Sequence, residues 1–275
     1  MATQIVKATD GTITLTIPLP KEEVKKTMEQ VIEKAVENAE LPGFRKGKAP
    51  RNLVEEKLDK AHLQEDTLRE ILPKAYSDAI LEHKLRPIMS PRIHISKIEE
   101  GNDWEFEAVT CEAPEVSLDG YKKAVGDVTS KSKIVVPGKE QQEVNMDDLI
   151  KALLSSVKIN VPQVLIDSEV DRLLSQMLDE VKSLGLSLDQ YLASTHKTID
   201  QLRSEYADRA RQDIAFEFAL QKIADEEKIT VEEKEVEEAI NKAKDDTERQ
   251  NLEANKYLLA SILRQQKTLD YLKHL

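Results

Sequence analysis

The sequence predicts an elongated, multidomain chain in which an α+β N-terminal domain is followed by an all-α helical C-terminal domain. Segments of alternating apolar and polar residues near both ends of the N-terminal part predict strands, and helical segments lie between them. From residue 145 onward the apolar residues recur at helical spacing. Aromatic residues make up only 4% of the chain and there are only 8 glycines, a composition that favours helical cores.

The N-terminal domain, residues 1–116, is expected to begin with a turn and a strand. Asp10-Gly11 is typical of a tight turn, and residues 12–17 alternate as a half-buried strand that Pro18 and Pro20 are expected to end. Helical periodicity then begins at Lys21 and is expected to stop at Leu41-Pro42-Gly43. The remaining elements are expected as a helix over 50–60, a helix over 61–84, and strands over 92–98 and 103–109.

Residues 117–144 are interpreted as a linker, because glycine and proline interrupt a polar stretch there. Residues 145–275 form the predicted helical domain. Capping boxes pair a Ser or Thr with a Gln or Glu three residues on, and each marks a helix start. The boxes are Ser187 with Gln190, Thr198 with Gln201, and Thr230 with Glu233. The helices expected from these signals cover 188–195, 199–226, 231–244 and 249–274.

The formal net charge of -12 argues against general binding to nucleic acid, because a uniformly acidic surface repels phosphate. Cys111 is the single cysteine, so no internal disulfide and no cysteine zinc cluster can form. The five histidines show no metal-ligand spacing, and no pair of carboxylates is indicated as catalytic. We therefore expect no catalytic residue, no metal and no cofactor. The absence of a signal peptide and of a stretch of ~20 apolar residues predicts a cytoplasmic protein without membrane contact.

One short segment, the basic loop (residues 43–50), concentrates positive charge in this acidic chain. Arg45, Lys46 and Lys48, followed by Arg51, are not interrupted by any acidic residue. A phosphate-binding loop is excluded, because only three residues separate the glycines and Ala49 follows the lysine where Ser or Thr is needed. Two interpretations remain: Phe44 is presented to a partner beside RNA phosphates, or it is turned into its own domain.

The basic loop also carries a family resemblance. The string Gly43-Phe44-Arg45-x-Gly47-x-x-Pro50 resembles the signature of the bacterial trigger factor family, and it lies between a long amphipathic helix and further helices, as in that family. Residues 112–116 and 159–169 also resemble family segments. The predicted ribosome-binding residues are Gly43, Phe44, Arg45, Lys46, Gly47, Lys48 and Pro50.

The resemblance implies an ATP-independent molecular chaperone that docks on the large ribosomal subunit near the exit tunnel. Phe44, Arg45 and Lys46 would contact a ribosomal protein and rRNA, and the helical domain would hold nascent and unfolded polypeptides. Family analogy also suggests a homodimer off the ribosome. The family usually inserts a prolyl isomerase domain of roughly 100 residues between the two parts. Fewer residues than that occupy the linker over 117–144, so we expect no isomerase activity and no enzyme.

Three other functions stay open from the sequence. The chain could be an isomerase-type folding enzyme, a periplasmic-type helical holdase, or a helical adaptor that holds no client. The expected cytoplasmic location opposes the periplasmic holdase. A proline-limited refolding assay tests the isomerase, and suppression of aggregation separates a chaperone from an adaptor.

Overall fold

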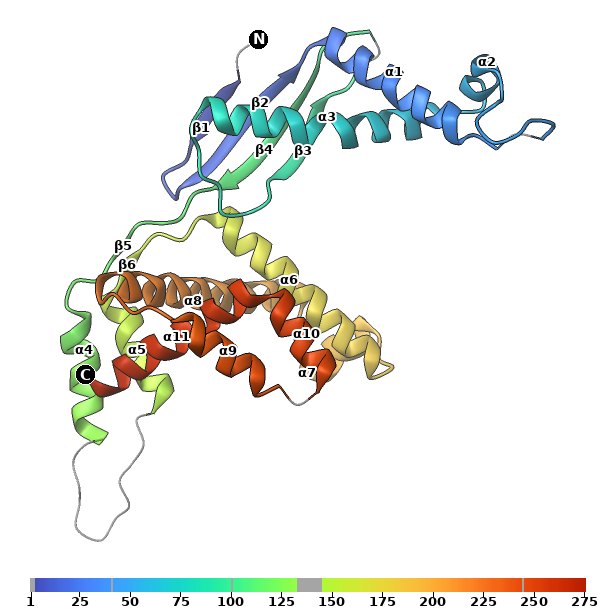
Figure 1. Cartoon of the computed structure of the whole chain (residues 1–275). Coiled ribbons are helices and arrows are strands. Elements are labelled where there is room, and N and C mark those ends of the chain that lie inside the picture. Colours follow the sequence, from blue (N-terminus) through green and yellow to red (C-terminus); the bar gives the residue numbers. More distant parts are fainter. Residues whose placement is uncertain (1–2, 41, 100, 133–144, 244) are drawn as a thin grey trace. The chain divides into compact units, whose positions relative to one another are not determined.

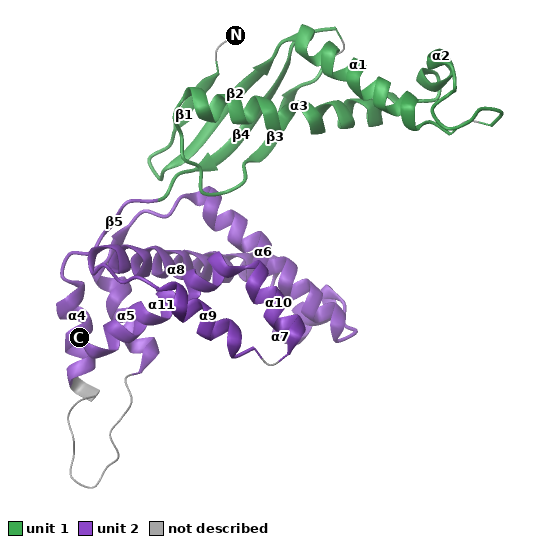
Figure 2. Cartoon of the chain, in the orientation of Figure 1, with its two compact units in different colours: residues 1–113 green, residues 114–275 purple. Residues whose placement is uncertain are grey.

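The computed structural model describes residues 3–40, 42–99, 101–132, 145–243 and 245–275 (Figure 1). The chain divides into two compact units, unit 1 (Met1–Ala113) and unit 2 (Pro114–Leu275), which are coloured separately in Figure 2. Unit 1 combines a sheet with helices, and unit 2 is mainly helical, so the predicted fold class is confirmed. The division lies close to residue 116, where we expected the first domain to end.

Unit 1 is built on a four-stranded antiparallel sheet with the strand order β1-β2-β4-β3. The strands are β1 (Gln4–Lys7), β2 (Thr12–Leu19), β3 (Arg92–Lys97) and β4 (Trp104–Cys111). The central strands β2 and β4 pair along their whole length, from Thr12 opposite Cys111 to Leu19 opposite Trp104. Every second residue of β2 is buried, so the alternation seen in the sequence places one face of the sheet on the core.

The helices of unit 1 are α1 (Lys21–Asn38), α2 (Arg51–Glu55) and α3 (Lys60–Glu82). Figure 1 shows α3 crossing one face of the sheet. Val24 of α1 and Leu68 and Ile71 of α3 are buried together with Trp104 and Phe106 of β4. This core fixes the direction of α1. It therefore also fixes where the basic loop begins at the far end of that helix.

Strand β2, which we predicted over residues 12–17, is longer than predicted. Pro18 was expected to end it, but β2 continues to Leu19. Among the described residues, the pairing of β1 with β2 reaches Thr16, and Pro18 lies opposite Glu105 of β4. A proline is tolerated in a strand where one side makes no ladder hydrogen bond, because its missing N–H is not needed there.

Unit 2 contains one short strand pair and eight helices among the residues that the structure describes. The strands are β5 (Val116–Ser117) and β6 (Lys158–Ile159). The helices are α4 (Tyr121–Ser132), α5 (Met146–Ser156), α6 (Gln163–Ser183), α7 (Leu188–Thr195), α8 (Ile199–Glu226), α9 (Glu233–Asn241), α10 (Asp246–Ala254) and α11 (Lys256–His274). The capping boxes predicted at Ser187 and Thr198 are confirmed, and α7 and α8 have the predicted limits.

Helix α8 takes part in all three apolar clusters of unit 2. Near its start, Leu202 packs with Met177 and Val181 of α6. In its middle, buried residues pack on the first half of α6. Near its end, Ile223 packs with residues of α4, α5 and α11, among them Leu153. The 28-residue helix α8 therefore connects every apolar cluster of unit 2.

The prediction of a linker over 117–144 is wrong for residues 121–132, which form α4. Tyr121, Val125 and Thr129 lie four residues apart and are all buried, so α4 presents one narrow buried stripe to the core. The composition of this segment suggested a linker because Gly120 precedes the helix and Gly126 lies inside it, where packing overrides the weak helix propensity of glycine. Residues 133–144 of the predicted linker lie outside the described residues.

The capping box predicted at Thr230 and Glu233 is also wrong. Helix α9 begins at Glu233, and the N–H of Glu232 donates to the carboxylate of Glu235 (2.8 Å). The residues before α9 are held against α11 instead: Lys267 donates to the Thr230 carbonyl (2.8 Å). The capping box of α9 is formed by Glu232 and Glu235, so Thr230 lies before the helix.

The single helix predicted over 249–274 is two helices, α10 and α11. Asn255 separates them with φ −116° and ψ 36°, outside helical geometry. Its side-chain amide donates to the carbonyl of Asn251 (2.9 Å), so the side chain satisfies a backbone acceptor at the end of α10. Asparagine competes with the helix in this way because its short amide reaches the local backbone.

A test of α4 as a core element is the change Val125→Ala. Since Val125 is fully buried, we expect the free energy of unfolding to fall by about 1–3 kcal/mol. The control, Lys123→Ala on the exposed side of α4, should stay within about 0.5 kcal/mol of the wild type. Urea unfolding followed by far-ultraviolet circular dichroism measures both. Equal stability of the two variants would contradict the packing described for α4.

Candidate functional site

The basic loop connects α1 to α2 and is folded back by backbone hydrogen bonds. The N–H of Gly47 donates to the carbonyl of Ala39 (3.1 Å), and the N–H of Lys48 donates to the carbonyl of Arg45 (2.9 Å). Pro50 stands at the N-cap of α2, where the helix does not need its N–H. The loop is therefore a closed turn with defined ends.

Gly47 is the position at which this loop depends on glycine. Its φ is +69°, a region that other residues rarely adopt. A Cβ atom on Gly47 would also lie 2.5 Å from the carbonyl oxygen of Glu37, which is far inside van der Waals contact. Gly43 has φ +89° but open space around it. The close approach of the loop to α1 thus requires glycine at 47 and only favours it at 43.

The side chains of the basic loop point to solvent. Phe44 is 43% exposed, and Arg45, Lys46 and Lys48 are exposed as well. Ala49 is the buried residue of the loop. The interpretation in which Phe44 turns inward is therefore wrong, and Ala49 is the residue that anchors the loop.

The charges of the loop are only weakly compensated. Lys46 lies 3.9 Å from the carboxylate of Glu40, and both side chains are exposed. Arg45 and Lys48 have no ion pair with any residue that the structure describes. Arg51 is engaged differently, because its hydrogen bond to Glu55 (2.5 Å) raises the pKa of its guanidinium. The loop thus presents an aromatic ring beside cations of which Lys46 has a distant carboxylate partner.

Unit 2 carries a second kind of surface, which we call the α11 surface: Tyr257, Leu258 and Ile262. Tyr257 is 90% exposed, and the other two side chains are also exposed. A pocket of about 470 Å³ lies beside them, between α8 and α11, and is lined by Leu220 and Tyr257 among others. Exposed apolar patches of this kind mark contact sites for apolar partners.

A third surface, the α6–α8 end surface, lies where α6 ends and α8 begins. It comprises the exposed side chains Leu178, Leu184, Leu186 and Ile199. Gly185, with φ +72°, follows the C-cap residue Leu184 of α6, and Leu184 is 74% exposed. The two apolar surfaces lie on different elements of unit 2.

The sequence analysis named no residue of these apolar surfaces. For α11 a signal was present, because six of the seven residues from Tyr257 to Leu263 are apolar. These apolar residues extend around more of the helix circumference than one packed face can bury, so some of them must be exposed. For Leu184 and Leu186 no periodic signal exists, because they lie in the turn that follows α6.

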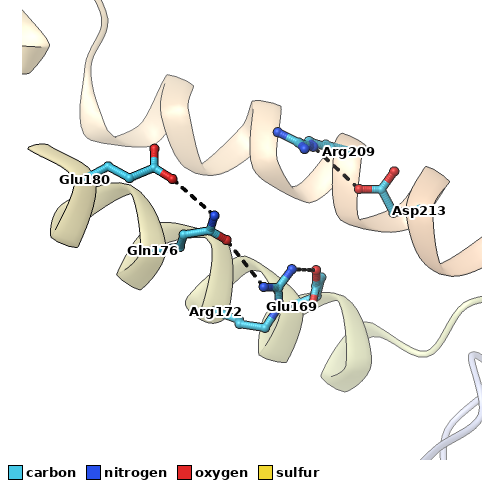
Figure 3. A network of polar contacts seen from close by, with 6 residues as sticks. All are labelled: Glu169, Arg172, Gln176, Glu180, Arg209 and Asp213. Carbon is cyan, nitrogen blue, oxygen red and sulfur yellow. Dashed lines mark hydrogen bonds and ion pairs between the residues drawn. The ribbon is translucent and has the colours of Figure 1, made fainter. Parts of the chain in front are cut away.

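Helices α6 and α8 also present polar side chains (Figure 3). Arg172 donates to Glu169 (2.6 Å) and to Gln176 (3.5 Å), and Gln176 donates to Glu180 (3.1 Å). On α8, Arg209 pairs with Asp213 at 3.5 Å. The contacts drawn run along each helix and not between them, so this face is a solvated one and not an apolar contact surface.

The described residues give little support for a nucleophilic, metal-binding or membrane-spanning site. Cys111 is fully buried, and this burial raises the pKa of its thiol to about 11, so it is no nucleophile at neutral pH. No group of three or more metal-ligating side chains occurs among the described residues. Of the helices that the structure describes, none is both long and apolar enough to cross a membrane.

Comparison with known proteins places both units in one family. Residues 1–147 match the family model of the bacterial trigger factor protein, and residues 138–274 match the model of its C-terminus. The trigger factors of Staphylococcus epidermidis and Staphylococcus aureus are each 40% identical over 108 residues. These matches cover 39% of this chain and 25% of each relative, so the chain matches about a quarter of those proteins.

A solved structure, described for promiscuous substrate recognition in folding and assembly activities of the trigger factor chaperone, shares the fold. Its TM-score is 0.65 at 14% identity, over 100% of this chain and 99% of the other. The two family models overlap at 138–147, which leaves no room for an isomerase domain between the parts they match. The first model alone covers more than half of the 275 residues, and the chain belongs to the bacterial trigger factor family.

Proposed function

We propose that this protein is an ATP-independent, ribosome-associated chaperone of the cytoplasm that holds nascent and unfolded polypeptides. The observation that carries the proposal is the basic loop, in which a closed turn presents Phe44, Arg45 and Lys46 to solvent. The loop belongs to unit 1, whereas the α11 surface and the α6–α8 end surface belong to unit 2. The two tasks, docking and holding, are thus assigned to separate units.

Docking rests on charge and on one aromatic anchor. In a chain with net charge -12, Arg45, Lys46 and Lys48 form a local positive site that suits RNA phosphates. The ring of Phe44 can at the same time fill an apolar pocket on a ribosomal protein, as aromatic anchors do at interfaces. Gly43, Gly47 and Pro50 are assigned to the shape of the loop and not to the contact itself.

Holding rests on dispersed apolar contacts. Each exposed surface of unit 2 is small, so each contact with an unfolded chain is weak. Docking near the exit tunnel raises the local concentration of the emerging chain, which lets weak contacts act together. A client that folds buries its own apolar residues and leaves, so release requires no nucleotide and no catalytic step. That the two matching family models overlap at 138–147 supports a chaperone without isomerase activity.

Ribosome docking is tested with the triple variant Phe44→Ala, Arg45→Ala, Lys46→Ala. We expect at least ~10-fold weaker co-sedimentation with large ribosomal subunits, because the anchor and two phosphate contacts are lost. The control Arg69→Ala, Lys74→Ala removes the same charge from exposed positions of α3 and should bind like the wild type. Raising the salt should weaken wild-type binding. Equal binding of the triple variant and the control would contradict docking by this loop.

Loop shape is tested with Gly47→Ala, which keeps Phe44, Arg45 and Lys46 in the chain. The added Cβ clashes with the Glu37 carbonyl, so we expect the loop to shift and ribosome binding to weaken several-fold. Gly120→Ala is the matched control: its φ of +81° is equally left-handed, but nothing lies within 4 Å of the new Cβ. Wild-type binding by Gly47→Ala would show that loop shape is unimportant.

Client holding is tested with Tyr257→Ser, Leu258→Ser, Ile262→Ser. Because these side chains are exposed, we expect the variant to fold normally but to suppress aggregation of a denatured test protein less well, by about half or more. Light scattering measures the effect, and Lys256→Ser, Gln266→Ser on the same helix is the control. A wild type that suppresses no aggregation would identify the chain as an adaptor instead.

A further inference from the structure

Unit 1 contains a pocket that neither the basic loop nor the surfaces of unit 2 use. This α1–α3 pocket has a volume of about 560 Å³, within the range of sites that bind small ligands or single anchoring side chains. It is bounded by the first half of α1, the first turns of α3 and the turn between β3 and β4. Helix α1 is about 27 Å long by its 18 residues, and the basic loop follows its other end.

The wall of the pocket is apolar. Val24, Met28 and Leu63 line it together with Trp104. The indole N–H of Trp104 donates to the carbonyl of Glu99 (3.1 Å), so the polar atom of this side chain is satisfied inside the protein. The interior therefore lacks an unpaired donor at the tryptophan and favours an apolar group from a ligand.

The rim of the pocket is basic. Lys21, Lys25 and Lys60 line it, and Glu22 is the carboxylate among its described lining residues. Nearby, the Asp103 carboxylate accepts the N–H of Lys21 (2.8 Å) and so serves as a partner of the first turn of α1. Without Lys60, the ammonium groups of Lys21 and Lys25 still outnumber the carboxylate of Glu22 among the described lining residues, which is notable in a chain of net charge -12. A ligand with carboxylates beside its apolar group matches both features.

The opposite side of α1 shows that this excess is local. A second hollow there is lined by Lys26 and Lys74 but also by Glu22, Glu23 and Glu70. Among the described residues, three carboxylates outnumber two ammonium groups in it, and Ile71 is its aliphatic residue. Lys25 and Lys26 are neighbours in sequence, yet they line different hollows.

We propose that the α1–α3 pocket binds an extended peptide segment in which one bulky apolar residue is flanked by Asp or Glu. The apolar side chain enters between Met28, Leu63 and Trp104, and the flanking carboxylates pair with Lys21 and Lys25. This site adds to the proposed function and rests on it for the source of the peptide, an unfolded client. It gives unit 1 a preference for acidic segments, whereas the apolar surfaces of unit 2 carry no such selection.

The pocket contains its own reporter, because Trp104 is the single tryptophan of the chain. The experiment titrates the whole protein with labelled and unlabelled eight-residue peptides that carry Leu-Phe between Glu and Asp residues. A second peptide has Lys in place of the acids. We expect a saturable change in Trp104 emission, matched by peptide anisotropy, and a Kd at least ~10-fold lower for the acidic peptide.

The variant Lys25→Glu should raise the Kd of the acidic peptide about 10-fold, whereas Lys26→Glu, with the same charge change one residue on, should stay within about 2-fold. Equal affinity for both peptides, or equal losses in both variants, would overturn the proposal. Two further results would also overturn it. One is that neither Trp104 emission nor peptide anisotropy detects binding, and the other is that decanoate displaces the peptide at a concentration far lower than that of the peptide. Ribosome co-sedimentation and aggregation of Lys25→Glu are measured in parallel, so a failure of this site is distinguishable from a failure of the proposed function.

Discussion

The burial of apolar residues along α8 is the interaction on which unit 2 depends. The helix is about 42 Å long by its 28 residues, and three apolar clusters follow one another along it. Leu202 lies in the first of them and Ile223 in the last. Because the core is distributed along one helix and not gathered in one centre, other helices contribute only part of their surface to it. Apolar side chains such as Tyr257 and Leu184 are then left in solvent, where the proposed clients would reach them.

Unit 1 differs from unit 2 in that it presents a few side chains in a fixed arrangement. A loop held only by its ends would give Phe44 and Arg45 many conformations, and ordering them on binding would reduce affinity. The hydrogen bond from Gly47 to Ala39 and the buried side chain of Ala49 restrict that freedom beforehand. Glycine at 47 is a consequence of this close approach to the carbonyl of Glu37.

Much of this architecture could be predicted from local signals. The alternation in residues 12–17 and the capping boxes at Ser187 and Thr198 identify elements whose cause lies in neighbouring residues. Helix α4 could not be predicted in this way, because its buried stripe acquires meaning only when α5 and α8 pack on it. The same holds near Thr230, where the sequence offers two capping boxes and the helix uses Glu232 with Glu235, while Lys267 of α11 binds the Thr230 carbonyl. The α1–α3 pocket combines three separate chain segments, so no single motif indicates it.

The central claim is that one molecule docks through unit 1 while it holds a chain through unit 2. Photo-crosslinking on stalled ribosomes tests it most directly, with the photoreactive group at Phe44 in one sample and at Leu258 in another. The account predicts that the group at 44 crosslinks to components of the large subunit and that the group at 258 crosslinks to the nascent chain. Crosslinks from 258 to the nascent chain together with none from 44 to the ribosome would contradict it.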